Sequence, residues 1–297
     1  MLLLPNNARI LGQGITGSEG SVSLPSMLDY GTNIVAGVTP GKGGQNLNGI
    51  PIFNTVKEAI ACVGMVDGAV QFVPPIYSKA AAVEAIDAGI KFILIGAEKV
   101  PTKDASIMCE YAKQHGVSIL GPSSVGIISP SNKIKIGPIG GNDPGRVYTK
   151  GNIAVISKSG GMTSEIGLLL KNHDLGISWA VGIGGDRIIC TDFVDFLLEL
   201  ENDDKTKASV VFGELGGTYE ERLAEFVKDK KIKKPVVAFI AGDFTQTLPT
   251  NVQFGHAGAI IEGSKGLPSE KRRILKEAGV FVANDFDEIP TILKNIK

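Results

Sequence analysis

The feature that most constrains how this chain folds is an alternation of short apolar runs with longer stretches of helical periodicity. In the first half of the sequence, five apolar runs have the length and composition of buried strands. These runs cover residues 8–11, 34–36, 69–73, 92–95 and 117–120. Residues 78–88 and 102–115 have the length and periodicity of helices. Strands that alternate with helices predict a parallel sheet with right-handed crossovers.

A second alternating series follows a segment rich in proline and glycine. Residues 126–150 include Pro130, Pro138 and Pro144, which indicate a linker with local turns. Further apolar runs then occupy residues 153–156, 179–181, 209–212, 236–240 and 280–282, with helical stretches between them. The sequence therefore predicts two α/β domains joined by a linker. The expected bounds are 1–128 for the first domain, 129–150 for the linker and 151–297 for the second domain.

Composition excludes several classes of function. The 297 residues carry a formal net charge of −1, so the chain has no broad basic field for nucleic acid or an anionic membrane. No apolar stretch approaches the roughly 20 residues that a membrane span needs, and the apolar start is too short for a signal peptide. We therefore expect a cytoplasmic protein, or one of the mitochondrial matrix if the source is eukaryotic.

The three cysteines, Cys62, Cys109 and Cys190, are isolated from one another and odd in number. Without a CxxC pair, they are typical of reduced, mostly buried thiols in an intracellular protein. We predict no metal site on this chain.

A glycine loop with GxGxxG spacing, residues 12–17, follows the first predicted strand and opens a helix. Such glycines let the backbone approach a phosphate, and the helix N-terminus supplies amide groups and partial positive charge. A dinucleotide site also needs a carboxylate at the end of the second strand, but this chain has Lys42 there, in a second glycine-rich loop. The pattern favours a phosphorylated nucleotide such as coenzyme A over NAD. A glycine-rich turn with a solvated lysine is the alternative.

Residues 157–165 form a second strand, glycine-rich turn and helix, which predicts a second anion site. The spacing is not that of a P-loop, and an ordinary helix N-cap is the alternative. Glu214 ends the third predicted strand of this domain, and Glu165 lies on the helix. Because ligands bind at the carboxyl ends of parallel strands, either carboxylate is placed to fix the tautomer of a histidine.

His256 is one of three histidines and has small neighbours on both sides. Small neighbours leave an imidazole accessible, and a neutral imidazole nitrogen is a good nucleophile towards phosphorus. A histidine in a tight turn is the alternative. His115 and His173 lie near predicted helix C-termini, where we expect surface residues that favour the helix dipole. A phosphate cradle, two carboxylates and an accessible histidine together predict a phosphohistidine site.

Several motifs together resemble the alpha subunits of succinyl-CoA synthetases, which are nucleoside-diphosphate-forming acid–CoA ligases. The motifs are GITG at 14–17, GVTPGKGG at 37–44, EAIDAGI at 84–90, GIGGD at 182–186 and GHAGA at 255–259. The resemblance covers essentially the whole chain. It implies a Rossmann-like CoA-binding domain followed by a flavodoxin-like domain with a doubly wound parallel sheet.

The resemblance also implies roles for individual residues. It implies a phosphorylated His256, with Glu165 and Glu214 as the two carboxylates that steady it. Phosphate would be held by Ser159, Gly160 and Gly161. CoA would be held by Gly14, Thr16, Gly17, Ser18, Glu19, Pro40, Lys42, Val73, Pro74 and Glu98. A beta subunit of the ATP-grasp type would supply the site for ATP or GTP and Mg²⁺, in a heterodimer or heterotetramer.

The chain departs from the succinate pattern in ways that bear on the acid substrate. Gly161, Ser123–Ser124 and Arg187 stand where the succinate enzymes usually have other residues, and they resemble ATP-citrate lyase and citryl-CoA synthetase. An additional arginine and a smaller turn would suit a bulkier, more charged acid, so Gly161 and Arg187 are the predicted substrate residues. We expect succinate, with citrate as the alternative and malate as a further one. A non-catalytic CoA-binding scaffold and an NAD enzyme are rival interpretations.

Overall fold

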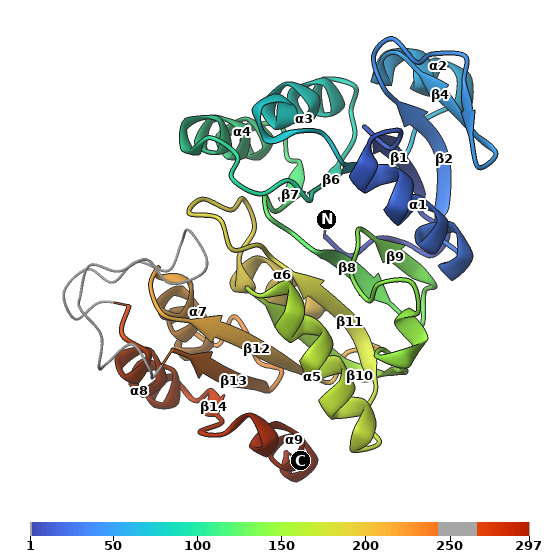
Figure 1. Ribbon diagram of the computed structural model, residues 1–297. Coiled ribbons are helices and arrows are strands. Elements are labelled where there is room, and N and C mark those ends of the chain that lie inside the picture. The colour runs from blue at the N-terminus through green and yellow to red at the C-terminus, as the bar shows by residue number, and fades with distance from the viewer. Residues whose placement is uncertain (1, 243–265, 297) are drawn as a thin grey trace.

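The computed structural model describes residues 2–242 and 266–296. They form two α/β units, each a sheet with its helices, that lie side by side (Figure 1). The first sheet, as far as it is described, has the strand order β3-β4-β2-β1-β5-β6-β7. Its strands are β1 (Arg9–Gln13), β2 (Asn33–Val38), β3 (Asn46–Leu47), β4 (Ile50–Phe53), β5 (Gly68–Gln71), β6 (Phe92–Ile95) and β7 (Ser118–Leu120). All pairs are parallel except β3 with β4. Leaving out β3, this order is that of a Rossmann fold.

Four α-helices connect these strands: α1 (Ser18–Tyr30), α2 (Val56–Val63), α3 (Ser78–Asp87) and α4 (Thr102–Gln114). The helix α1 begins directly after Gly17 and ends at Gly31, whose φ of 105° is the left-handed conformation of a glycine C-cap. The five apolar runs predicted as strands are confirmed. The strands β3 and β4 were not predicted, because they are short and interrupted by Gly49 and Pro51.

The second sheet has the order β14-β13-β12-β10-β11-β8-β9 within the described residues. Its parallel strands are β10 (Lys150–Ser157), β11 (Ile177–Gly182), β12 (Ala208–Glu214), β13 (Val236–Ala241) and β14 (Phe281–Val282). Its helices are α5 (Gly160–Asn172), α6 (Phe193–Leu200), α7 (Tyr219–Lys228), α8 (Pro268–Ala278) and α9 (Ile289–Asn295). The parallel strands follow the flavodoxin-like order, so the predicted fold class is confirmed.

The segment predicted as a linker contains more than turns. The strands β8 (Gly126–Ser129) and β9 (Ile134–Ile136) form an antiparallel hairpin, and β8 pairs with β11 at one side of the second sheet. The prolines and glycines nearby hide these two short apolar runs from a sequence pattern. The boundaries at 128 and 151 stay a prediction.

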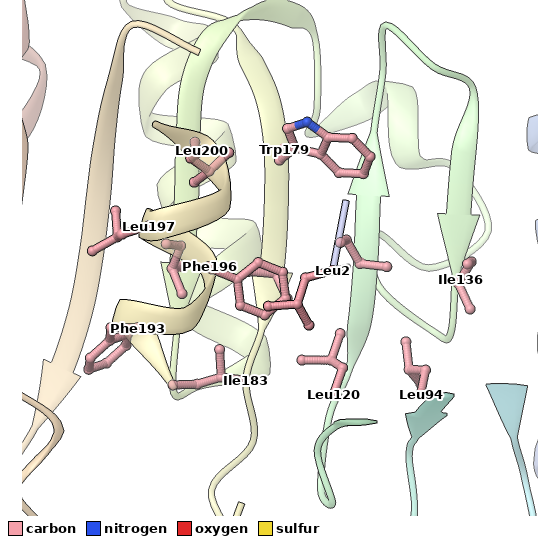
Figure 2. Close-up of a cluster of buried hydrophobic side chains, with 14 of the residues drawn as sticks. Leu2, Leu94, Leu120, Ile136, Trp179, Ile183, Phe193, Phe196, Leu197 and Leu200 are labelled. Atoms are coloured by element: carbon pink, nitrogen blue, oxygen red, sulfur yellow. The ribbon is translucent and has the colours of Figure 1, made fainter. Parts of the chain in front are cut away.

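One hydrophobic core joins the two sheets. In Figure 2, Leu120 of the first sheet lies near Leu2 and Ile183, and Leu94 lies near Ile136 of β9. All of these side chains belong to one buried cluster, which also includes Trp179. Trp179 is only 4% exposed, and Leu94 and Leu120 are fully buried. Because close-packed interiors resist deformation, this shared core holds the facing edges of the two sheets in a fixed relation.

A disulfide also links the two parts of the chain, which corrects the prediction of reduced thiols. Cys109 of α4 is bonded to Cys190, at a sequence separation of 81 and a Cα–Cα distance of 4.9 Å. Cys62 is free and exposed rather than buried. The spacing gave no sign of this pair, because α4 and the segment after β11 meet only in the tertiary structure.

Replacing Cys109 by serine is expected to lower the free energy of unfolding by about 2–4 kcal/mol in oxidising buffer, because the crosslink restricts the unfolded chain. With a reductant present, the two proteins should be equally stable. Urea denaturation followed by circular dichroism measures both conditions. Cys62→Ser is the control, since Cys62 forms no crosslink. Equal stabilities in oxidising buffer would contradict the prediction.

Candidate functional site: two pockets and a buried ion pair

The first candidate pocket lies at the carboxyl ends of β1, β2 and β5 and has a volume of about 590 Å³. The predicted CoA residues that line it are Gly14, Thr16, Gly17, Pro40, Lys42, Val73 and Pro74. A hydrogen bond of 3.0 Å between Thr16 Oγ1 and Thr39 Oγ1 connects its two glycine-rich loops. The Asn54 side chain accepts hydrogen bonds from the backbone of Gly41 and Gly43, at 2.9 and 3.0 Å. The loop that carries Lys42 therefore has a defined shape.

Glycine is required at position 14 for two reasons. Its φ of +73° favours glycine, and a Cβ there would lie 2.8 Å from the carbonyl oxygen of Phe72. Gly41 offers a comparison, because its φ is +78° but nothing lies within 4 Å of an added Cβ. The close approach of Gly14 to the end of β5 thus shapes the pocket.

Replacing Gly14 by alanine is expected to weaken CoA binding about tenfold to a hundredfold more than replacing Gly41 by alanine. Both variants incur the left-handed backbone cost of about 1–2 kcal/mol. Only Gly14→Ala adds a clash with backbone, and overpacking of this kind costs about 1–3 kcal/mol. Isothermal titration of each variant with CoA measures the difference. Equal affinities would contradict the prediction.

The second pocket lies between the two sheets and has a volume of about 810 Å³. The first domain contributes Gly17, Ser18 and Glu19 at the start of α1, together with Val73, Pro74 and Glu98. The second domain contributes Lys158, Ser159, Gly160 and Gly161, at the start of α5. Two helix N-termini therefore border one cavity, and both favour anionic groups. All ten residues predicted to hold CoA line one of the two pockets.

A buried amide tests whether the cavity between the sheets suits CoA. Gln13 Nε2 donates a hydrogen bond to the carbonyl of Ala81 at 2.9 Å, which fixes the orientation of the Gln13 amide. Gln13 Oε1 then accepts a hydrogen bond from Gln71 Nε2, also at 2.9 Å. This leaves the buried Gln71 Oε1, an acceptor, without a partner among the described residues, and Gln71 lines the cavity. A ligand with donors satisfies such an atom, whereas carboxylates and phosphates offer only acceptors. The pantetheine arm of CoA carries amide N–H groups and a thiol, so the residues fit CoA.

The turn before α5 holds its residues in the way an anion site requires. The Ser159 side chain is the N-cap and accepts from the Met162 N–H at 3.4 Å. Ser157 Oγ donates to the Ser159 carbonyl at 2.7 Å, which fixes the turn from the strand side. The first amides of a helix have no acceptor within the helix. Those of Met162 and Thr163 donate to Ser159, which leaves the amides of Gly160 and Gly161 available to a ligand. An added Cβ at Gly161 would meet nothing within 4 Å, so this position borders open space.

Glu214 is paired with a lysine that the prediction of catalytic residues did not include. Lys158 Nζ lies 3.2 Å from Glu214 Oε1, and their side chains are 2% and 14% exposed. Lys158 Nζ also lies 5.5 Å from the centre of the Tyr219 ring, a cation–π contact. Burial, reinforced by the charge of Asp192, raises the pKa of Tyr219 to about 12, so its hydroxyl stays neutral. The sequence places Lys158 beside the predicted anion site, but only the fold brings it to Glu214.

Two predicted site residues do not lie with this group. Glu165 is exposed on α5, and Arg187 is exposed on the segment after β11. Neither lines the cavity between the sheets. The neighbouring Asp186 accepts from the backbone of Lys99 and Val100 at 3.3 Å, which connects this segment to the first domain. His256 lies outside the described residues.

The two other histidines have the structural role expected of them. His115 and His173 are the C-caps of α4 and α5 and are exposed. Each ring Nδ1 is hydrogen-bonded to a carbonyl of its own helix, at 2.8 and 2.9 Å. The described part of the chain holds no cluster of histidine, cysteine and carboxylate residues that suits a metal ion. None of its helices is long and apolar enough to cross a membrane.

Comparison with known proteins defines the class to which this fold and site belong. Residues 5–99 match the family model of a CoA binding domain, and residues 156–283 match that of a CoA-ligase. The chain therefore combines a CoA binding domain with a CoA-ligase domain.

Relatives of known name narrow the class to a family. The chain is 44% identical to succinate–CoA ligase [ADP-forming] subunit alpha 1 of Archaeoglobus fulgidus, over 95% of this chain and 93% of the relative. It is 41% identical to the succinate–CoA ligase [ADP-forming] subunit alpha of Staphylococcus epidermidis, over 98% of this chain and 93% of the relative. This chain belongs to the succinate–CoA ligase alpha-subunit family, which is a family of acid–thiol ligases.

Among solved structures, the ATP citrate lyase of Methanothrix soehngenii in complex with citrate and coenzyme A has a similar fold. Its TM-score is 0.90 and its sequence identity 27%, over 99% of this chain and 50% of that one. The resemblance to both succinate and citrate enzymes agrees with the mixed motifs of the sequence.

Proposed function

We propose that this chain is the alpha subunit of a nucleoside-diphosphate-forming ligase that joins succinate to CoA through a phosphorylated His256. The observation that carries the proposal is the cavity between the sheets. It brings the CoA-binding loops of the first domain within reach of the α5 N-terminus and of Lys158, which is paired with Glu214. CoA supplies the thiol that ends up in the thioester.

The proposed reaction proceeds by phosphoryl transfer. An imidazole nitrogen of His256 attacks the γ-phosphorus of ATP or GTP, and the nucleoside diphosphate leaves. A carboxylate oxygen of the acid then attacks the phosphorus, which frees the imidazole and forms an acyl phosphate. Attack of the thiol sulfur on the acyl carbon releases phosphate. The amides of Gly160 and Gly161 and the hydroxyl of Ser159 hold the phosphoryl group, and Glu214, with Glu165, steadies the imidazole.

The proposal assigns the nucleotide and Mg²⁺ to an ATP-grasp beta subunit, in a heterodimer or heterotetramer. The names of the relatives, which are alpha subunits, support such a partner.

Citrate is the second candidate substrate. Gly161 supports it, because the open space at this turn accommodates a larger acid than a residue with a side chain would allow. The similarity to a citrate-bound ATP citrate lyase supports it also. Arg187 would recognise the additional carboxylate only if its exposed segment turned towards the cavity.

Labelling tests both the mechanism and the substrate. The chain is mixed with its beta subunit, Mg²⁺ and γ-³²P-labelled ATP or GTP, and acid-labile, base-stable label on the alpha chain is measured. The label is then chased with succinate plus CoA or citrate plus CoA. We expect label that succinate discharges, and discharge by citrate alone would favour the second candidate. No label with either nucleotide and an active beta subunit would overturn the proposal and favour a CoA-binding scaffold.

A further inference from the structure

A fully buried ion pair lies directly behind the strand end that carries Glu214. Glu220, at the start of α7, is paired with Lys271 of α8, and both side chains are 0% exposed. Lys271 Nζ also lies 3.3 Å from a carboxylate oxygen of Glu221, which is 28% exposed. Neither Glu220 nor Lys271 lines the cavity between the sheets, so this pair does not itself contact a ligand there.

Each member of the pair forms a hydrogen bond with the backbone of the segment from Glu214 to Gly217. Glu220 Oε1 accepts a hydrogen bond from the Glu214 N–H at 3.3 Å. Lys271 Nζ donates to the carbonyl of Gly217 at 3.1 Å. The segment 215–218 belongs to no strand or helix, and Gly216 and Gly217 have positive φ values of 78° and 64°. The ion pair therefore supplies backbone hydrogen bonds that a sheet would otherwise supply.

The residue before Glu214 leaves space for the carboxylate of Glu220. A Cβ at Gly213 would lie 2.4 Å from Glu220 Oε1 and 2.8 Å from Ile240 Cδ1, so any larger residue would displace the Glu220 carboxylate. On the other side, Glu214 Oε1 is 3.2 Å from Lys158 Nζ. Glu214 is thus held at its backbone by Glu220 and at its carboxylate by Lys158.

Stability alone does not account for a pair of this kind. Removing two charges from water costs several kcal/mol per ion, and apolar residues of similar volume are often as stable or more so. Apolar side chains cannot, however, bond to the Glu214 N–H and the Gly217 carbonyl. We infer that Glu220 and Lys271 are positioning residues, which hold the 213–217 loop so that the Glu214 carboxylate stays beside Lys158 in the geometry that phosphoryl transfer needs. This inference rests on the role proposed for Glu214.

The test replaces the pair and asks whether its effect depends on Glu214. Glu220→Leu with Lys271→Met removes both backbone hydrogen bonds together with both charges of the buried pair. Glu221 loses its contact with Lys271, but its carboxylate is 28% exposed and stays hydrated. In the complex with the beta subunit, we expect kcat to fall about 10- to 100-fold, as for a small misplacement of a catalytic group. The Kd for CoA should not change. In a Glu214→Gln background, the same replacement should lower kcat no further, which a merely structural role would not predict.

Two further variants complete the test. Lys271→Arg keeps a cation at this position and should retain most of the turnover. Glu270→Gln with Arg273→Met removes an exposed ion pair from the same helix, and kcat should stay at the wild-type value. If the apolar pair fails to fold, Glu220→Gln keeps the packing and enters the same cycle with Glu214→Gln.

A folded apolar variant with wild-type kcat, or a full additional loss in the Glu214→Gln background, would overturn the inference. Wild-type kcat in Glu214→Gln alone would instead overturn the role proposed for Glu214, and the positioning role with it.

Discussion

A chain in which alanine replaces His256 is expected to take up no acid-labile phosphoryl label and to show no measurable ligase turnover with its beta subunit. The imidazole is the proposed nucleophile, and alanine offers no atom that can accept the phosphoryl group. CoA binding should be unchanged, because the residues proposed to hold CoA belong to the first domain. Incorporation of ³²P measured beside CoA titration separates the two properties.

The other two histidines provide matched controls for this experiment. His115 and His173 cap their own helices and lie on the surface, so each alanine variant should keep the wild-type extent of labelling. Label that persisted in His256→Ala, or disappeared in either control, would contradict the assignment of the phosphorylated residue.

The second large effect is expected from Glu214→Gln, which should lower kcat by about 10²-fold. Glu214 is proposed to orient the imidazole, and a misplacement of about 1 Å at a reacting group costs about this much. Glutamine keeps the shape of the side chain but removes the charge that pairs with Lys158. The lysine would then be a buried cation without its partner, free to attract the phosphoryl group away from the transfer geometry. The carboxylate would also no longer fix the tautomer of the imidazole.

Single-turnover labelling measures the rate of phosphoryl transfer in Glu214→Gln, and steady-state kinetics measure its kcat. The Kd for CoA is expected to stay unchanged. Asp229→Asn is the control, because it removes a carboxylate from an exposed pair with Lys231. Such surface pairs contribute about 0–1 kcal/mol, so neither kcat nor stability should change appreciably. If Glu214→Gln turned over at the wild-type rate, the carboxylate would have no direct part in the reaction.

Local patterns identified most of the fold. Each strand predicted from an apolar run is present, because a buried parallel strand must be apolar on both faces and leaves a continuous signal. The short strands β3 and β4 and the β8–β9 hairpin left no such signal. Gly49 and Pro51 interrupt β3 and β4, and the hairpin lies among prolines and glycines, so no continuous apolar run marks these strands.

The candidate site was only partly predictable for a related reason. The glycine loops mark their own positions, since a phosphate-binding turn needs a particular local backbone. Partners that are distant in sequence leave no local trace. Lys158 meets Glu214, Lys271 meets Glu220, and Cys109 meets Cys190, at separations from 51 to 81 residues.

The sequence by itself determined the α/β class, the order of the main strands and helices, the positions of the two glycine-rich turns and the family. These follow from periodicity and from local backbone requirements, which act over a few residues. The tertiary structure alone decided that the two domains share a core, that a cavity lies between them, and that Glu214 is held between two buried lysines, one in direct contact and one through Glu220. Such contacts depend on how helices and sheets pack, and packing is set by the whole chain at once.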